Sequence, residues 1–308
     1  MYPVLFRLGS FTVTGYAALV DVGLLAGAAI ACLAARQRGL NLARVLDAVL
    51  AAAVGGVIGG RVAYVAAKWA YYQDHVRRAL RPWDGGLSWH GALAGGVVAV
   101  LTYCAIRRIS LRAMLDVLAP GVAVLAACAW LGCLMNGCAY VIETYPGQGV
   151  LWALSMELPD LYGIRAPRVA VQLLGAGWSA VTLAALVFVG RRPRFEGLAF
   201  PLWVALYSVG SFGLGFLRAD EVAMVAGWRA DQVADLALAV IGAVTLAVGL
   251  ASRKTLRVLK GLTPRRYSDD RDRGTRTGDV PVETPGAGRQ RHDRGGRAAG
   301  GRGGEASG

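Results

Sequence analysis

The chain has 308 residues, of which 55% are hydrophobic and only 17% are charged. A soluble domain of this length carries more charge, so the composition excludes an ordinary soluble enzyme and is typical of helices that face lipid. The formal charge of +13 does not indicate a nucleic acid partner, because Lys and Arg lie in short loops and a C-terminal tail instead of on one folded face.

Seven apolar segments follow one another along the chain, each about long enough to cross a bilayer. The expected helices cover residues 11–34, 46–68, 87–106, 113–136, 168–190, 197–217 and 229–251. The sequence therefore predicts an all-α, polytopic membrane protein with seven transmembrane helices. We expect residues 1–261 to form this membrane domain. Residues 262–308 are rich in Gly and Arg and nearly lack large apolar side chains, which predicts a disordered basic tail.

The positions of Arg and Lys predict the orientation of the chain. The loops after the first, third and fifth segments and the start of the tail are rich in these residues. With seven segments these four regions share one side, which should be the cytoplasm, so the N-terminus lies outside and the C-terminus inside. The segment near 69–86 carries Arg77, Arg78 and Arg81 on the outer side, with aromatic residues between. We interpret it as an amphipathic arm at the headgroup level.

Polar residues gather near the outer end of every expected helix. They are Tyr16, Asp21, Arg61, His90, Asn136, Gln172, Arg218, Asp220, Gln232 and Asp235. An ionisable group inside a membrane costs at least about 2.5–3.5 kcal/mol on insertion scales, so such groups are retained mainly for pairing or function. Each alone could snorkel to the interface. Together they predict a cavity that is open to the outer leaflet and offers cations to an anionic headgroup.

Short sequence strings stand at these positions. Residues 85–96 read GGLSWHGALAGG, which puts His90 at a helix entrance flanked by glycines. Residues 131–140 read LGCLMNGCAY, and residues 216–220 read FLRAD. Cys133 and Cys138 have no accompanying His or second Cys pair, so their spacing does not indicate a zinc site. We expect neither a metal nor an organic cofactor. Gly56 with Gly60, and Gly91 with Gly95, form GxxxG spacings that permit close helix packing.

In their order, these strings resemble motifs of the prolipoprotein diacylglyceryl transferases. The first resembles the segment GG-x-S-[FW]-HG-G, the second R-I-G-C-F-x-N-G-C-C-Y-G, and the third F-[FL]-R-x-D. Gly60-Arg61 is similar to a GGR segment, Gly15-Tyr16 to a Tyr-Gly region, and 167–173 to R-H-P-x-Q-L-Y-E. The resemblance covers about residues 3–251. It identifies the chain as a divergent member of that family.

The resemblance implies a reaction and its partners. A diacylglyceryl group would pass from phosphatidylglycerol to the lipobox cysteine thiol of a prolipoprotein, forming a thioether and releasing glycerol phosphate. The partners would be phosphatidylglycerol, the prolipoprotein signal-peptide region and the lipid bilayer, with no nucleic acid. The location would be the bacterial cytoplasmic membrane, crossed several times.

The resemblance and the chemistry of the reaction together assign roles to residues. The expected catalytic residues are His90, Arg218 and Tyr16, and the expected substrate-binding residues are Arg61, Asn136, Gly137, Gln172, Arg168, Asp220 and Gln232. Fixed cations would hold the leaving phosphate, which is the role of Arg218 and Arg61. His90 would accept the thiol proton or orient the donor headgroup. Asp220 would orient Arg218, and the other polar side chains would bind glycerol or phosphate oxygens.

The chain also departs from the family motifs. Trp130 stands where the signature begins with Arg, Val141 where it ends with Gly, Val169-Ala170 replace His-Pro, and Leu174-Gly175 replace Tyr-Glu. Because an indole cannot supply a guanidinium, either Arg61 or Arg168 makes that phosphate contact or activity is impaired. A catalytically impaired homologue that binds phospholipid or lipoprotein precursor is therefore one alternative. A small-solute transporter is another, although the polar groups favour one face and no inverted repeat is evident.

Overall fold

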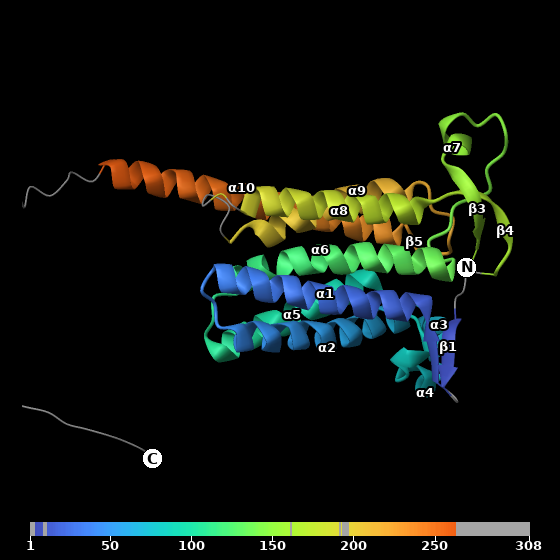
Figure 1. The fold of residues 1–308 in the computed structure, drawn as a ribbon, viewed down its shortest axis with the longest axis horizontal. Helices are drawn as coiled ribbons and strands as arrows, with labels where there is room; N and C mark the ends of the chain where they lie inside the picture. Colours follow the sequence, from blue (N-terminus) through green and yellow to red (C-terminus); the bar gives the residue numbers. More distant parts are fainter. Residues whose placement is uncertain (1–3, 9–10, 161, 191, 193–196, 263–308) are drawn as a thin grey trace, which may run out of the picture. The chain divides into compact units, whose positions relative to one another are not determined.

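Seven long helices make up most of the part of the chain that the computed structural model describes, which is residues 4–8, 11–160, 162–190, 192 and 197–262. They run alongside one another (Figure 1). Their bounds are α1 Gly15–Gln37, α2 Leu42–Ala67, α5 Trp89–Arg107, α6 Leu111–Asn136, α8 Val171–Gly190, α9 Ala199–Gly215 and α10 Ala230–Leu262. The tail expected at 262–308 lies almost entirely outside the described residues.

Shorter elements gather at one end of the helices (Figure 1). Three antiparallel hairpins are formed by β1 (Val4–Leu8) with β2 (Phe11–Thr14), β3 (Ser155–Pro159) with β4 (Arg165–Val169), and β5 (Met224–Val225) with β6 (Trp228–Arg229). The same end holds α3 (Trp69–Tyr72), α4 (Val76–Ala79), the 3-10 turn Pro82–Asp84 and α7 (Val150–Ala153). The prediction of an all-α fold is thus wrong for these hairpins, because their strands are too short to give a clear alternating pattern.

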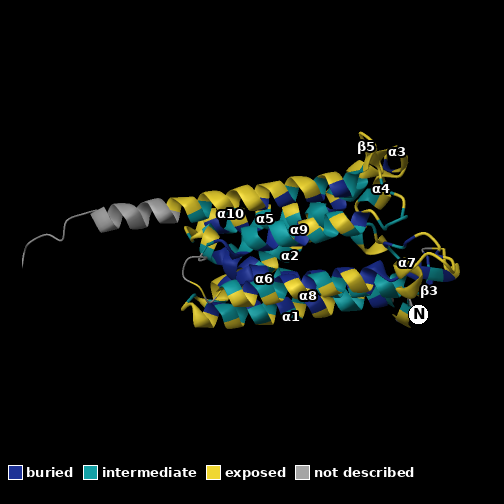
Figure 2. Cartoon of the chain, turned by 90° about the horizontal axis from the view of Figure 1, so that it is seen from above, coloured by how far each residue is buried: buried dark blue, intermediate teal, exposed yellow. Residues whose placement is uncertain are grey.

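Six of the helices are long and apolar enough to cross a membrane, with mean hydropathy between 1.5 and 2.2. In five of these helices only 11–22% of the apolar window is buried, whereas 44% is buried in α6. Exposed residues accordingly cover the outer helices (Figure 2). Such a surface is stable facing lipid and not water, so the chain is a multi-pass membrane protein. The sixth expected segment forms α9, which is apolar but has 17 residues.

Two expected helical segments begin on strands. Residues 11–14 belong to β2 and residues 168 and 169 to β4. Consequently Arg168 lies on a strand, while Gln172 lies in the first turn of α8. The apolar composition alone cannot distinguish an entering strand from the first turn of a helix, so the sequence places these boundaries only within a few residues.

Small residues let the helices approach closely. α6 packs between α1 and α8, and α2 packs along α5. A β-carbon on Gly59 would lie only 2.5 Å from the carbonyl oxygen of Gly91, and one on Gly55 would lie 2.6 Å from that of Gly95. Gly91 and Gly95 therefore lie in the contact, against Gly59 and Gly55. Gly56 and Gly60 also face this neighbour, where a β-carbon would lie 3.4 Å from the Ala92 carbonyl oxygen and 3.2 Å from that of Ser88.

A buried carboxylate fixes the start of α9. Asp116 of α6 accepts hydrogen bonds from the backbone N–H groups of Gly197 and Ala199, the latter at 2.8 Å. Arg38, from the loop that follows α1, lies 3.5 Å from the same carboxylate. The first N–H groups of a helix lack partners within the helix, and a carboxylate there is favourable. Asp116 therefore sets the position of α9 against α6, and with it the side chains that α9 presents to the site.

Candidate functional site

His90 of α5 lies within hydrogen-bond distance of an aspartate of α10. It is the second residue of α5, whose first turn is capped by the Ser88 side chain accepting from the Gly91 N–H. Its Nε2 lies 2.9 Å from Oδ1 of Asp235 on α10, and the Asp235 side chain is only 4% exposed. A carboxylate on one ring nitrogen fixes the orientation of an imidazole. Asp235 therefore holds the His90 ring in one direction.

Arg218 is the centre of a four-membered charge cluster with Asp220, Arg229 and Asp231. Arg218 contacts Asp220 at 2.6 Å and Asp231 at 3.1 Å. Arg229 contacts the same two carboxylates, each at 3.1 Å. Two cations and two anions balance, so the cluster can be desolvated at moderate cost.

The two guanidinium groups of the cluster differ in how many of their N–H donors are hydrogen-bonded within the protein. Arg229 donates to both carboxylates and to the backbone oxygens of Arg218 and Asp220, which occupies all of its N–H groups. Within the described residues, Arg218 directs one N–H at Asp231 and two at Asp220. A guanidinium has five N–H donors, so roughly two remain on Arg218 for a ligand.

The neighbouring carboxylates keep the Arg218 guanidinium protonated. Burial alone would lower the pKa of its guanidinium, but the hydrogen bonds to Asp220 and the charges of the neighbouring carboxylates outweigh burial and raise the pKa above its usual value. Asp231 of the cluster and Asp235 of the His90 pair are four residues apart on α10, so the two sets of charged groups lie about one helical turn apart. A fixed cation therefore stands near a proton acceptor.

The segment after α6 joins the two sides of the site. α6 ends at Asn136, and Gly137 follows with a φ of +71°, which favours glycine. A β-carbon on Gly137 would also lie 2.6 Å from the Asp160 carbonyl oxygen. A disulfide links Cys133 to Cys138 across this turn. The sequence suggested only that these two cysteines do not form a zinc site; their pairing depends on the chain reversing at Gly137.

Backbone and side-chain hydrogen bonds then hold residues 138–141. Gln172, buried at the start of α8, donates to the carbonyl oxygens of Cys138 at 2.8 Å and Ala139 at 3.4 Å. The Ala219 N–H donates to the Tyr140 carbonyl oxygen at 2.9 Å. These contacts bring the turn that carries Asn136 and Gly137 next to the Arg218 segment.

Arg168 has an internal set of partners. It donates to the Val141 carbonyl oxygen at 2.6 Å, to Glu143 at 3.2 Å and to Asp160 at 3.3 Å. Its Nε and the Gln172 Oε1 are buried without a partner among the described residues. Burying such an atom costs free energy unless a ligand or a water molecule forms a hydrogen bond with it.

Tyr16 and Gln232 each contact a neighbouring helix. Tyr16, in the first turn of α1, packs against α6 at Gly132, where a β-carbon would lie 3.0 Å from the ring. Gln232 is buried and donates to the Phe212 carbonyl oxygen of α9 at 3.3 Å. Tyr16 is thus held against α6 and Gln232 against α9.

Arg61 is enclosed by the expected outer arm, residues 69–86. Its guanidinium donates to the carbonyl oxygens of Ala79 at 2.9 Å, Gly85 at 2.6 Å and Gly86 at 3.0 Å, and to that of Arg78. The Tyr72 ring lies 5.3 Å from the guanidinium carbon. Four of its roughly five donors are thus directed at the backbone, which gives Arg61 a structural task.

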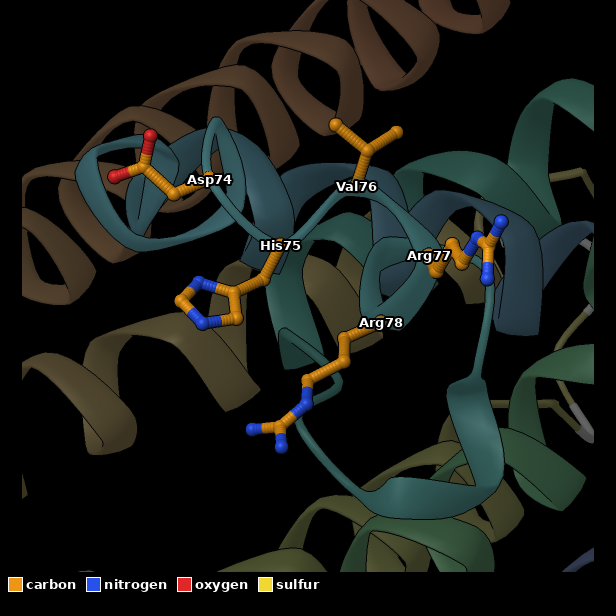
Figure 3. Close-up of a pocket in the computed structure, with 5 residues that line it drawn as sticks. All are labelled: Asp74, His75, Val76, Arg77 and Arg78. Carbon is orange, nitrogen blue, oxygen red and sulfur yellow. The ribbon is translucent and has the colours of Figure 1, made fainter.

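An open cavity of about 440 Å³ lies on this arm, lined by Asp74, His75, Val76, Arg77 and Arg78 (Figure 3). None of the expected site residues lines it. Trp69, Leu80 and Trp83 of the arm are exposed, which fits an element at a membrane interface.

Sequence reasoning missed Arg229, Asp231, the partnership of Asp235 with His90, and Tyr207. One signal was available for the first two, because the tripeptide Arg-Ala-Asp occurs at 218–220 and again at 229–231. Two Arg-x-Asp units that flank one hairpin can pair crosswise, as β5 and β6 allow here. No comparable signal marks Tyr207, which lies in a purely apolar helix. Among the described residues, no group of three or more His, Cys, Asp or Glu side chains could hold a metal ion.

Comparison with known proteins identifies the family. A sequence profile described as "Prolipoprotein diacylglyceryl transferase" matches residues 3–248. A relative from Clostridium tetani is 27% identical over 242 residues, covering 79% of this chain and 95% of the relative. One from Streptococcus uberis is 25% identical over 79% of this chain and 93% of its own length. One from Bacillus licheniformis is 27% identical over 87% of this chain and 96% of its own length.

All three relatives bear the name phosphatidylglycerol–prolipoprotein diacylglyceryl transferase. The profile match extends from the first hairpin to within α10 and includes every group of the site described above. The chain therefore belongs to the prolipoprotein diacylglyceryl transferase family.

Proposed function

We propose that this protein transfers the diacylglyceryl group of phosphatidylglycerol to the cysteine thiol of a prolipoprotein. One observation carries the proposal beyond family membership. Arg218, a cation with spare donors, pairs with Asp231, which lies about one turn of α10 before Asp235, the carboxylate that holds His90. A reaction that needs both a phosphate ligand and a proton acceptor finds both at one end of the bundle.

The reaction is displacement at carbon. The thiol gives its proton to His90, the resulting thiolate attacks the glyceryl carbon, a carbon–sulfur bond forms, and the carbon–oxygen bond to phosphate breaks. Glycerol phosphate leaves with the electron pair of that bond. Arg218 neutralises the charge that develops on the departing phosphate. Asp235 holds the imidazole as it becomes positive, and Asp220 fixes the direction of the guanidinium.

The remaining site residues bind and orient the substrates in this proposal. Tyr16, Asn136 and Gln172 donate to or accept from glycerol and phosphate oxygens, and the free Oε1 of Gln172 supplies an acceptor for a glycerol hydroxyl. Gly137 and Gln232 shape the cavity wall. Arg168 supports the segment that carries them through its contact with the Val141 carbonyl oxygen.

Arg61 takes a different role from the phosphate contact that the sequence suggested. Its guanidinium is engaged with four carbonyl oxygens of the arm, so its contribution is to hold the arm against α2. Because Trp130 offers no guanidinium either, Arg218 is the phosphate ligand that the proposal depends on. A catalytically impaired homologue is favoured by Trp130 alone, and no contact described above favours a transporter.

The proposal includes the arrangement in the membrane. Seven helices, α9 among them, cross the bacterial cytoplasmic membrane, with the N-terminus outside and the C-terminal tail of 262–308 in the cytoplasm. The hairpins and the arm then lie at the outer surface, where the cysteine of an exported precursor emerges. The disulfide between Cys133 and Cys138 supports this orientation, because disulfides persist on the oxidising side of the membrane.

The test uses the purified full chain in vesicles that contain phosphatidylglycerol, with a lipobox peptide as acceptor. We expect the peptide to gain the mass of a diacylglyceryl group while glycerol phosphate is released in equal amount. A peptide with Ser in place of its Cys is the control and should remain unmodified. If the folded protein modifies neither peptide, the proposed function is wrong.

A further inference from the structure

A tyrosine hydroxyl lies beneath the charged groups of the site. Tyr207 of α9 is 5% exposed. It lies eight residues before Gly215, the last residue of α9, which is about 12 Å along a helix. Arg218 follows the end of that helix, and the Tyr207 ring lies 5.6 Å from the ring of Trp89, the residue directly before His90. The hydroxyl is therefore near the site but deeper in the bilayer than the charge cluster.

Aromatic packing accounts for the Tyr207 ring but not for its hydroxyl. The ring stacks on Trp203, with 5.3 Å between centroids and an interplanar angle of 23°, and lies 5.6 Å from the Trp89 ring. A phenylalanine would make the same ring contacts without a polar group to desolvate. Removing an oxygen-bound hydrogen from water without an acceptor costs free energy, so the hydroxyl requires an explanation of its own.

The hydroxyl oxygen has one partner, and its hydrogen has none among the residues that the structure describes. Trp130 donates from its indole N–H to the Tyr207 oxygen at 3.2 Å. A hydroxyl is both a donor and an acceptor, and here only the acceptor function is occupied. Because the Trp130 N–H approaches the oxygen, the Tyr207 hydrogen must point away from the indole, where it can donate to a ligand.

Trp130 is held in this position by Gly175. A β-carbon at position 175 would overlap the indole ring, so the ring can lie there only because α8 has glycine at that point. Trp130 is itself buried. The indole therefore has little freedom to rotate, and its N–H keeps the Tyr207 hydroxyl in one orientation. Trp130 acts on the site through Tyr207 and is a positioning residue.

We propose that the Tyr207 hydroxyl donates a hydrogen bond to an ester carbonyl oxygen of the diacylglyceryl donor, and that Trp130 orients it. The inference rests on the function proposed above. In a phospholipid the ester carbonyls lie deeper than the phosphate. A lipid whose phosphate is held by Arg218 therefore carries an ester group toward Tyr207. A carbonyl oxygen is a stronger acceptor than an ether oxygen, so the hydroxyl selects ester-linked over ether-linked donors.

The test compares two donors that differ only at this linkage. Vesicles contain either diacyl phosphatidylglycerol or its dialkyl-ether analogue, with the full chain and a lipobox peptide. For the wild-type protein we expect kcat/KM to be about tenfold or more higher with the ester donor, the range set by one buried donor without its acceptor. Tyr207→Phe should reduce this ratio to near one, mainly by slowing transfer from the ester donor.

Two matched variants separate positioning from packing. Trp130→Phe keeps a ring above Gly175 but removes the N–H, so the ester preference should fall about threefold. In the Tyr207→Phe background the same change should have no further effect on the ratio. Trp203→Phe alters the other face of the stack and leaves the hydroxyl untouched, so it should keep the ester preference.

The outcomes are distinguishable. The ratio of two rates from one preparation does not depend on how much of a variant is folded, so a loss of stability cannot imitate the result. If Tyr207→Phe retains the wild-type ester preference, or slows both donors equally, the inference is wrong while the proposed function stands. If the wild-type protein transfers from neither donor, the proposed function fails and this inference fails with it.

Discussion

Arg218 and Arg229 bind the same two carboxylates, which makes them a matched pair for testing the phosphate contact. Arg218→Ala removes the contacts to Asp220 at 2.6 Å and Asp231 at 3.1 Å. Both carboxylates keep Arg229 as a partner, and the Arg218 side chain is 19% exposed, so we expect a loss of only about 1–2 kcal/mol of unfolding free energy. The transition state loses its fixed cation, which costs about 100- to 1000-fold in rate.

Arg229→Ala should have the opposite profile. All of its donors are bound within the protein, two of them to the backbone oxygens of Arg218 and Asp220. Its removal leaves those oxygens without a partner, so we expect a loss of about 2–4 kcal/mol. Arg218 remains and still pairs with both carboxylates, so the rate of the folded fraction should fall by less than about tenfold.

The assay measures initial rates of glycerol phosphate release from phosphatidylglycerol vesicles, with thermal unfolding of each variant recorded in the same lipid. The rate is divided by the folded fraction at the assay temperature. The reasoning is refuted if Arg218→Ala stays within about threefold of the wild-type rate. It is also refuted if the corrected rate of Arg229→Ala falls as far as that of Arg218→Ala.

Three further changes test separate parts of the site. His90→Asn removes the titratable ring beside Asp235 and should slow thioether formation about 100-fold or more; a full rate in the peptide assay would exclude a base role for His90. Replacing Cys133 and Cys138 together by Ser should lower the unfolding free energy by about 2 kcal/mol, the value for so short a loop, and reduce transfer; ready labelling of both cysteines of the unmodified protein without a reductant would contradict the disulfide. Arg61→Lys replaces a planar fork with a single ammonium that cannot reach four carbonyl oxygens, so amide exchange of residues 78–86 should accelerate; unchanged protection would show that Arg61 does not hold the arm.

The positions of the long helices can be predicted from short stretches of sequence. The seven apolar segments correspond to the seven long helices, because a helix that faces lipid needs an uninterrupted apolar stretch wherever it occurs. The errors lie at boundaries and in short elements. Arg168 was assigned to a helix and lies on β4, since an extended residue next to a helix start has no distinct local pattern.

For the candidate site too, the sequence predicts some features and misses others. Motif strings identify His90, Arg218 and Gln172 as unusual polar residues at helix ends, and composition identifies the arm. Composition and motifs do not identify the partners of these residues. Arg61 resembled a phosphate ligand in the sequence, but its donors turn to backbone carbonyl oxygens of the arm. Carbonyl groups occur at every residue, so the sequence cannot indicate which of them a guanidinium will meet.

What the sequence determined by itself is the environment, the family and the types of chemical group available, because hydropathy and motifs are properties of neighbouring residues. The tertiary structure decided which groups meet: His90 with Asp235, 145 residues away, and Trp130 with Gly175 and Tyr207. Such contacts follow from how whole helices pack, and a packing depends on the shape of both surfaces at once. From the sequence, Trp130 is only a position that lacks the arginine of the family motif. In the structure, its ring packs against Gly175 and its N–H donates to the Tyr207 hydroxyl.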